Sequence, residues 1–179
     1  MSAVYTTERL ELREFSLNDV EGFFEMNADP VVIRFTGDRA FIDQKETEQF
    51  IQAYDQYEKY GYGRWSVYLK GTEDYLGFCG LKYSPEKQET DIGFRLMRKF
   101  WNKGFATEAA IACLDAGFQK YGLEKIVGRA MVDNQASIRV LEKLGMSKAF
   151  EYTEEGRPWV QYELKANDYA SMVKRSLPE

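Results

Sequence analysis

Near the start of the chain the spacing of apolar residues changes from that of a strand to that of a helix. Leu10 and Leu12 alternate with the charged residues Glu11 and Arg13, which predicts a strand over 8–14. Beyond this strand the apolar positions recur every three or four residues, as they do on a helix that buries one face. Two helices are predicted here. The first begins with Ser16 as its cap and stops near Pro30, and the second runs over 43–60 and ends at Gly61 and Gly63.

The middle of the chain alternates short apolar runs with turn residues, which is typical of an antiparallel meander. A long helical pattern follows over 105–121, with apolar side chains at i, i+3, i+4 and i+7. Because this helix joins strands 88–97 and 125–132, we expect those strands to be parallel neighbours with a right-handed crossover. The remaining predicted elements are strands at 64–70, 75–84, 147–155 and 158–165, and helices at 135–144 and 167–175.

Length and composition are those of one folded domain, which we expect to span residues 1–179. The chain is 44% hydrophobic and 30% charged, enough apolar surface for a sizeable core. Its net charge of −5 argues against a nucleic-acid binder, whose surface is basic. We see neither an N-terminal signal-like apolar region nor an apolar stretch near the roughly 20 residues that span a bilayer, so we expect a cytoplasmic protein without membrane partners.

The sequence contains no histidine, and this excludes several kinds of site. A Ser-His-Asp triad, a Cys-His dyad and a His-ligated metal centre all require that residue. Cys79 and Cys113 lie in apolar surroundings and are expected to be buried, reduced thiols, too few for a structural zinc site. We therefore expect no metal.

A cationic segment stands out in this acidic chain, where predicted strand 88–97 gives way to predicted helix 105–121. Between residues 92 and 107 there are cations but no anions, and Gly104 allows a ligand close to the backbone. The cations are Arg95, Arg98, Lys99 and Lys103. Free N–H groups at a helix start beside such residues bind anions, and a pyrophosphate fits this description. The segment matches neither a Walker A loop nor Gly-x-Gly-x-x-Gly.

Two segments carry a resemblance to a known family. Trp101-Asn-Lys-Gly-Phe-Ala-Thr-Glu-Ala109 resembles the pyrophosphate loop of the GNAT superfamily of N-acetyltransferases, whose pattern is Gln/Arg-x-x-Gly-x-Gly/Ala. Asn134-Gln-Ala-Ser-Ile-Arg-Val-Leu-Glu-Lys-Leu-Gly-Met146 resembles the downstream segment of that superfamily. Thr7-Glu-Arg-Leu-Glu-Leu-Arg13, and Trp65 followed by Leu76-Gly-Phe-Cys-Gly80, are similar to the RimJ/RimL-type branch, which includes acetyltransferases of ribosomal-protein N-termini.

The chain departs from the superfamily pattern at two positions. Trp101 replaces the usual Gln or Arg, and Val140 stands where many members carry a Tyr general acid. The resemblance nevertheless implies a GNAT-like α/β (α+β) domain. Its twisted sheet would be mixed but mostly antiparallel, with one parallel strand pair splayed around the cofactor and helices on both faces.

The same resemblance implies acetyl-CoA as co-substrate. The backbone of residues 94–96 would pair with the pantetheine arm, and the N–H groups of 102–107 would hold the pyrophosphate. Asn134 would bond the pantetheine or a nearby backbone group, although it is also suited to cap a helix. The expected cofactor-binding residues are Phe94, Arg95, Leu96, Asn102, Lys103, Gly104, Phe105, Ala106, Thr107 and Asn134.

The chemistry expected is direct attack of an amine on the thioester. Ser137 is a candidate general acid for the departing thiolate, and Glu89 and Asp91 are candidate bases. Each also has an ordinary alternative: Ser137 as a small packing residue, and the two carboxylates as solvated strand-end charges. The acceptor would be a protein N-terminus or a small-molecule amine.

Other readings of the sequence stay open at this point. A CoA-binding regulatory module without turnover is an alternative to the enzyme, because the usual Tyr acid is missing. The sequence is also compatible with a homodimer, in which the partner is a second copy of the chain.

Overall fold

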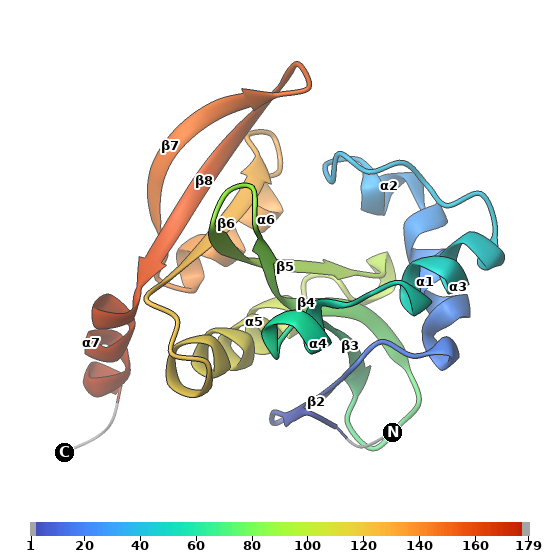
Figure 1. Ribbon diagram of the computed structural model, residues 1–179, viewed down its shortest axis with the longest axis horizontal. Helices are drawn as coiled ribbons and strands as arrows, with labels where there is room; N and C mark the ends of the chain where they lie inside the picture. Colours follow the sequence, from blue (N-terminus) through green and yellow to red (C-terminus); the bar gives the residue numbers. More distant parts are fainter. Residues whose placement is uncertain (1–2, 177–179) are drawn as a thin grey trace.

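The computed structural model describes residues 3–176, which form one eight-stranded sheet with helices on both faces (Figure 1). The strands are β1 (Tyr5–Thr6), β2 (Leu10–Arg13), β3 (Arg64–Leu69), β4 (Tyr75–Ser84), β5 (Glu89–Leu96), β6 (Lys125–Met131), β7 (Ser147–Glu154) and β8 (Arg157–Lys165). The α-helices are α1 (Val20–Ala28), α2 (Pro30–Ile33), α3 (Gln44–Gln52), α4 (Gln56–Tyr60), α5 (Phe105–Asp115), α6 (Gln135–Lys143) and α7 (Ala166–Ser176).

The strand order β1-β2-β3-β4-β5-β6-β8-β7 contains a single parallel pair, β5 with β6, and this confirms that the two strands joined by α5 are parallel neighbours. All other neighbours are antiparallel. β5 pairs with β4 along its whole length but with β6 only at Asp91 and Ile92. The parallel strands therefore separate beyond Ile92, and residues 93–96 have a strand neighbour only on the β4 side.

Two apolar layers cover the two faces of the sheet. On one face α5 buries Ala109, Ala110, Cys113 and Leu114 against side chains of β2 to β6. On the other face Phe78 of β4 stacks on Phe23 of α1, with ring centroids 5.7 Å apart. Neighbouring residues 78 and 79 thus point to opposite layers, as alternation along a strand requires. Helices on both faces were predicted, and the structure confirms them.

The helix predicted over 43–60 is in fact two helices. α3 ends at Gln52 and α4 begins at Gln56, because the intervening residues turn the chain so that two tyrosines can reach β3. The hydroxyl of Tyr54 accepts a hydrogen bond from the backbone N–H of Arg64 at 2.7 Å, and the hydroxyl of Tyr57 donates to the Arg64 carbonyl. These contacts hold the turn between the two helices and the start of α4 against the start of β3.

The helix predicted over 105–121 is regular only to Asp115 and continues as a π-helical turn over 116–120. Gly117 lies in this turn, and a Cβ there would come within 2.6 Å of Ile126. The short helix α2 was not predicted. It begins at Pro30, and the Asp29 side chain caps it by accepting from the N–H of Val31 at 2.9 Å. Among residues 3–176, no helix is both long enough and apolar enough to cross a membrane.

Candidate active site

A cleft of about 780 Å³ lies where β5 and β6 separate. Its walls come from α1, the segment 35–41, α3, β4, β5, β6 and the start of α6. Phe94 packs with the α5 layer, whereas Arg95 faces α1, and both line the cleft. The cleft therefore passes through the sheet between the two strands, and it gives a reacting group on one face access to a partner on the other.

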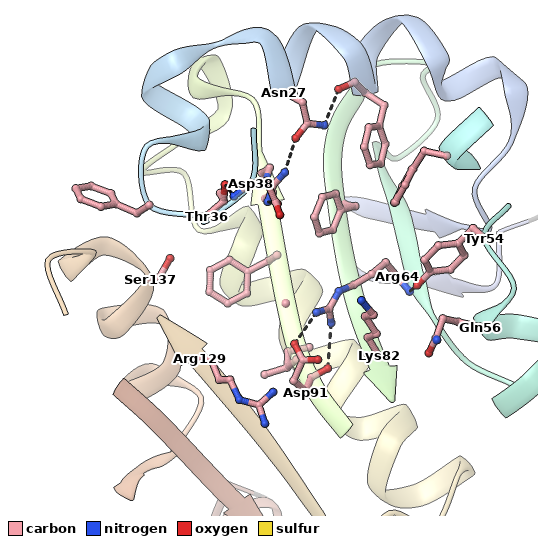
Figure 2. A pocket seen from close by; sticks show the side chains of 18 of the residues that line it. Asn27, Thr36, Asp38, Tyr54, Gln56, Arg64, Lys82, Asp91, Arg129 and Ser137 are labelled. Carbon is pink, nitrogen blue, oxygen red and sulfur yellow. Dashed lines mark hydrogen bonds and ion pairs between the residues drawn. The ribbon is translucent and has the colours of Figure 1, made fainter. Parts of the chain in front are cut away.

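The floor of the cleft holds a largely buried ion pair, with the Arg64 side chain 14% exposed and the Asp91 side chain 17% exposed. Arg64 Nη2 lies 2.6 Å from Asp91 Oδ2, and Arg64 Nη1 donates to the Asp91 carbonyl at 3.0 Å (Figure 2). The guanidinium lies over Gly93, where a Cβ would stand only 2.4 Å from Nη2. Burial lowers the pKa of Arg64, but the charge and hydrogen bond of Asp91, together with Tyr54, outweigh burial and raise this pKa above its usual value. Arg64 is therefore held as a cation beside Asp91.

A second ionic cluster borders the floor. Glu89 accepts hydrogen bonds from Lys125 at 2.9 Å and Arg129 at 2.5 Å, and Arg129 Nε donates to Gln161 at 2.9 Å. Burial raises the pKa of Glu89, but the Lys125 hydrogen bond and the two cations outweigh burial and leave this pKa below its usual value. Glu89 is thus a fixed carboxylate that orients Arg129 toward the cleft.

At the opposite end of the cleft Arg95 links three segments. Its Nη2 lies 2.5 Å from Asp38 in the α2–α3 loop, and its Nη1 donates to the Asn27 side chain of α1. Asn27 in turn donates to the Phe23 carbonyl at 2.9 Å. A ring of aromatic side chains covers the wall beside them: Phe15, Phe23, Phe41, Phe50, Tyr54 and Phe78. This end of the cleft is therefore apolar with a polar rim.

The chain that leaves β5 turns into the N-terminus of α5. Gly104 has a φ of 80° and no side chain caps the first turn of the helix. Glu108 accepts hydrogen bonds from Thr7 Oγ1 at 2.6 Å and from Arg9 Nε at 2.7 Å. Arg9 also donates to the Lys103 carbonyl at 3.0 Å. The β1–β2 turn thereby holds the 103–108 segment and leaves the N–H groups at the helix start facing outward.

Trp101 anchors the same segment from the other side. Its indole Nε1 donates to the Leu96 carbonyl at 2.7 Å, which closes the turn between the end of β5 and α5. Trp101 is thus a structural residue at the position where the superfamily pattern has Gln or Arg. Since the Leu96 carbonyl is already bonded, the main-chain groups that remain for a ligand beside β6 are those nearer Phe94.

The start of α6 faces the cleft from the β6 side. Asn134 caps this helix, with its side-chain oxygen accepting from the Ser137 N–H at 3.2 Å. Figure 2 shows the Ser137 side chain pointing from the helix into the cleft, and its hydroxyl forms no hydrogen bond within residues 3–176. A half-buried hydroxyl so placed is free to donate to a ligand.

Residues 9–147 match the family model described as Acetyltransferase (GNAT) domain. The chain belongs to the GNAT acetyltransferase family. GNAT enzymes use acetyl-CoA, and the open strand edge followed by an uncapped helix start is the part of this structure that suits such a ligand.

Relatives of this GNAT chain agree in sequence and in fold. The N-acetyltransferase p20 of Bacillus licheniformis is 32% identical over 150 residues, 83% of this chain and 84% of p20. A GNAT acetyltransferase structure from Bacillus anthracis superimposes with a TM-score of 0.79 at 26% identity, covering 90% of this chain and 98% of that one. The spermidine N-acetyltransferase of Vibrio cholerae, solved with CoA and spermine, shares the fold at a TM-score of 0.79 and 16% identity, over 92% and 99% of the chains.

The structure gathers some of the GNAT site residues expected from sequence and separates others. Asp91, Phe94, Arg95, Asn134 and Ser137 all line the cleft. Glu89 and Leu96 do not, and the expected pyrophosphate segment lies beyond the end of β5, outside the cleft wall. That segment consists of Asn102, Lys103, Gly104, Phe105, Ala106 and Thr107, of which Phe105 is buried and Asn102 to Gly104 are exposed.

Sequence reasoning missed three cations at the cleft floor, Arg64, Lys82 and Arg129. They come from three different strands, so no local motif connects them. A partial signal exists in Gly80 and Gly93, which lie opposite each other on β4 and β5: Gly93 leaves room for the Arg64 side chain, and Gly80 leaves room for the backbone at residues 63 and 64. Glycines inside strands often mark such a close approach.

Proposed function

We propose that this chain transfers the acetyl group of acetyl-CoA to a primary amine by direct attack. The observation that carries the proposal is the continuous path from the splayed edge of β5 to the uncapped start of α5, with the cleft alongside. This arrangement supports binding of the cofactor along β5 and of the acceptor in the cleft.

The residues fit the chemistry of CoA at both ends of this path. An amide-containing pantetheine arm can pair with the free main-chain edge at residues 93–95 as an added strand would. The pyrophosphate would be held by N–H groups of 102–107, where the positive φ of Asn102 and Gly104 turns the backbone and the helix dipole favours an anion. Lys103 and Arg98 would add longer-range attraction.

The reaction forms a bond between the amine nitrogen and the acetyl carbon as the carbon–sulfur bond breaks. The amine loses a proton and the departing thiolate gains one. Ser137 is placed to donate to the sulfur, and Asp91, which is paired with Arg64, is the candidate base that lines the cleft. Burial raises the pKa of Tyr54, so its hydroxyl stays protonated and does not serve as the base.

Positioning would supply most of the rate enhancement in this scheme. An α-amine has a pKa of about 7.7–8.0 and is substantially neutral near physiological pH, so it needs little help in losing its proton. Holding the amine and the thioester together can contribute roughly 7–11 kcal/mol, against 10²–10⁴-fold for a dedicated base. The segment 7–13 is similar to the RimJ/RimL-type branch, and this similarity supports placing the chain in that branch. The acceptor would then be a protein N-terminus or a small amine.

The test is release of free CoA thiol from acetyl-CoA in the presence of an amine panel, with the acetylated product identified by mass spectrometry. We expect release that requires both protein and amine. A calorimetric titration with CoA runs in parallel. CoA binding without transfer to any amine would identify a regulatory module instead, and absence of CoA binding would overturn the proposal altogether.

A further inference from the structure

The charges around the cleft favour one class of acceptor. We propose that the acceptor is an amine that also carries an anionic group and an apolar body, of which an aromatic α-amino acid is the simplest example. This inference rests on the proposed function, since it concerns the amine that enters the same cleft.

Cations outnumber carboxylates on the cleft wall, five to three. The cations are Arg39, Arg64, Lys82, Arg95 and Arg129, and the carboxylates are Asp38, Asp55 and Asp91. Every one of these carboxylates has an ion-pair partner: Asp38 has Arg95, Asp55 has Lys59, and Asp91 has Arg64. Each carboxylate on the wall is therefore already partly neutralised before a substrate binds.

Lys82 is the cation without a partner. It stands directly opposite Asp91 in the β4–β5 register, close enough in a strand pair for the two side chains to interact. The Asp91 carboxylate instead faces Arg64, whose guanidinium is enclosed between the strands and depends on it for neutralisation. The Lys82 ammonium consequently forms no ion pair within residues 3–176, and it remains exposed at the cleft.

Arg129 lies on the other side of Asp91 (Figure 2). Its Nη2 is bonded to Glu89 and its Nε to Gln161, which hold the guanidinium in place with its side chain only 13% exposed. Two cations from β4 and β6 thus flank the floor, and a carboxylate or phosphate on the acceptor would be attracted there. The same two cations would repel a polyamine, which is itself positively charged.

The opposite wall specifies the rest of the acceptor. Its aromatic side chains come from α1, α3, β4 and the loops beside them, and Phe50 keeps 40% of its surface exposed. Apolar walls with a few placed polar groups are typical of small-molecule sites. An acceptor with an aromatic or bulky aliphatic body would contact this wall while its anionic group lies near Lys82.

Matched acceptors test the proposal. L-Phenylalanine is compared with L-phenylalaninamide, phenethylamine and spermidine, and the peptide amide Phe-Glu is compared with Phe-Gln to ask whether a protein N-terminus supplies the anion. We expect kcat/KM to be at least about tenfold higher for the anionic member of each pair, and spermidine to be the poorest acceptor. Higher activity with spermidine, or equal activity within both pairs, would overturn the proposal.

Variants of Lys82 separate a specific role from a general loss of activity. Lys82→Ala should raise KM for the anionic acceptor about tenfold with little change in kcat, leave KM for its amide unchanged, and leave CoA affinity unchanged. Lys82→Glu should reverse the preference within each pair. Lys143→Ala, an exposed lysine at the end of α6 away from the cleft, is the control and should change none of these values.

Binding of the same amines to the protein–CoA complex, measured by calorimetry, distinguishes this inference from the proposed function. Lys82-dependent binding of phenylalanine without any transfer would support the acceptor class and reject catalysis. Acetyl transfer to anionic and non-anionic amines at equal rates would support the proposed catalysis and reject the proposed preference for anionic acceptors. Absence of both binding and transfer would reject both.

Discussion

The guanidinium of Arg64 on β3 reaches Asp91 on β5 by passing over two intervening strand positions, Gly80 and Gly93, that have no side chains. The resulting 2.6 Å ion pair lies at the point where β5 and β6 part. It neutralises a charge that would otherwise be buried alone, and it also removes Asp91 as a partner for Lys82. One contact thus affects both the stability of the fold and the charge of the cleft.

The first prediction concerns this ion pair. Asp91→Asn should lower the free energy of unfolding by about 3–5 kcal/mol, because it leaves the Arg64 charge buried without a counterion. Asp38→Asn is the comparison, since Asp38 is 62% exposed and Arg95 keeps its hydrogen bond to Asn27, so this change should cost about 1 kcal/mol or less. Urea unfolding measures both. Equal losses in the two variants would show that burial of Arg64 does not govern the effect.

The second prediction is a pH dependence of stability that arises at Glu108. Burial raises the pKa of this carboxyl, but hydrogen bonds from Thr7 and Arg9 outweigh burial and leave the folded-state pKa below the ordinary value of 4.5. The unfolded chain therefore takes up the proton first as pH falls. The stabilisation is fully present above pH 4.5 and is lost as pH falls through the depressed folded-state pKa.

Unfolding of the native chain and of Glu108→Gln, followed at several pH values from neutral to about 3, checks the second prediction. The difference in stability between the two proteins should shrink as pH falls through this window. A difference that stays constant with pH would contradict the assignment. Glu48→Gln, on the exposed side of α3, serves as the control and should leave the profile unchanged.

The third prediction concerns Gly104 at the start of α5. Gly104→Asp should weaken CoA binding by about a hundredfold or more, equivalent to roughly 2.7 kcal/mol, because it sets a carboxylate against the phosphates. Gly104→Asn is the control, since Asn tolerates the left-handed φ of 80° and adds no charge. Its affinity should fall less than tenfold. Calorimetry that finds equal losses for Asp and Asn would exclude a phosphate at this turn.

The fourth prediction concerns Ser137. Ser137→Ala should lower kcat/KM about tenfold, or roughly 1.4 kcal/mol, because it removes a proton donor but leaves the positioning groups of the backbone in place. Ser137→Cys keeps a donor at the same position and should restore part of the activity. Glu89→Gln should do less than Ser137→Ala. A loss beyond about a thousandfold in any of these folded variants would reveal an indispensable acid or base that this scheme lacks.

The local pattern of apolar, capping and turn residues was sufficient to predict much of the fold. The parallel pairing of β5 with β6 was predictable because a helix of fixed hand must join them, and α6 was predictable from its capping Asn134 and apolar spacing. The break between α3 and α4 was not. Tyr54 and Tyr57 have the spacing of one helical face, and only their hydrogen bonds to the backbone around Arg64 show that the chain turns there.

The sequence by itself determined the family, the strand–turn–helix with its cations and Gly104, and the Asn134–Ser137 helix start, because each is encoded within one continuous segment. Only the tertiary structure decided which charges in the cleft are neutralised. Arg64, Lys82 and Asp91 lie on three adjacent strands, and their pairing depends on cross-strand register and on the space that Gly80 and Gly93 leave. A largely buried guanidinium requires its counterion more than an exposed ammonium does, so Arg64 holds Asp91, and Lys82 forms no ion pair within residues 3–176.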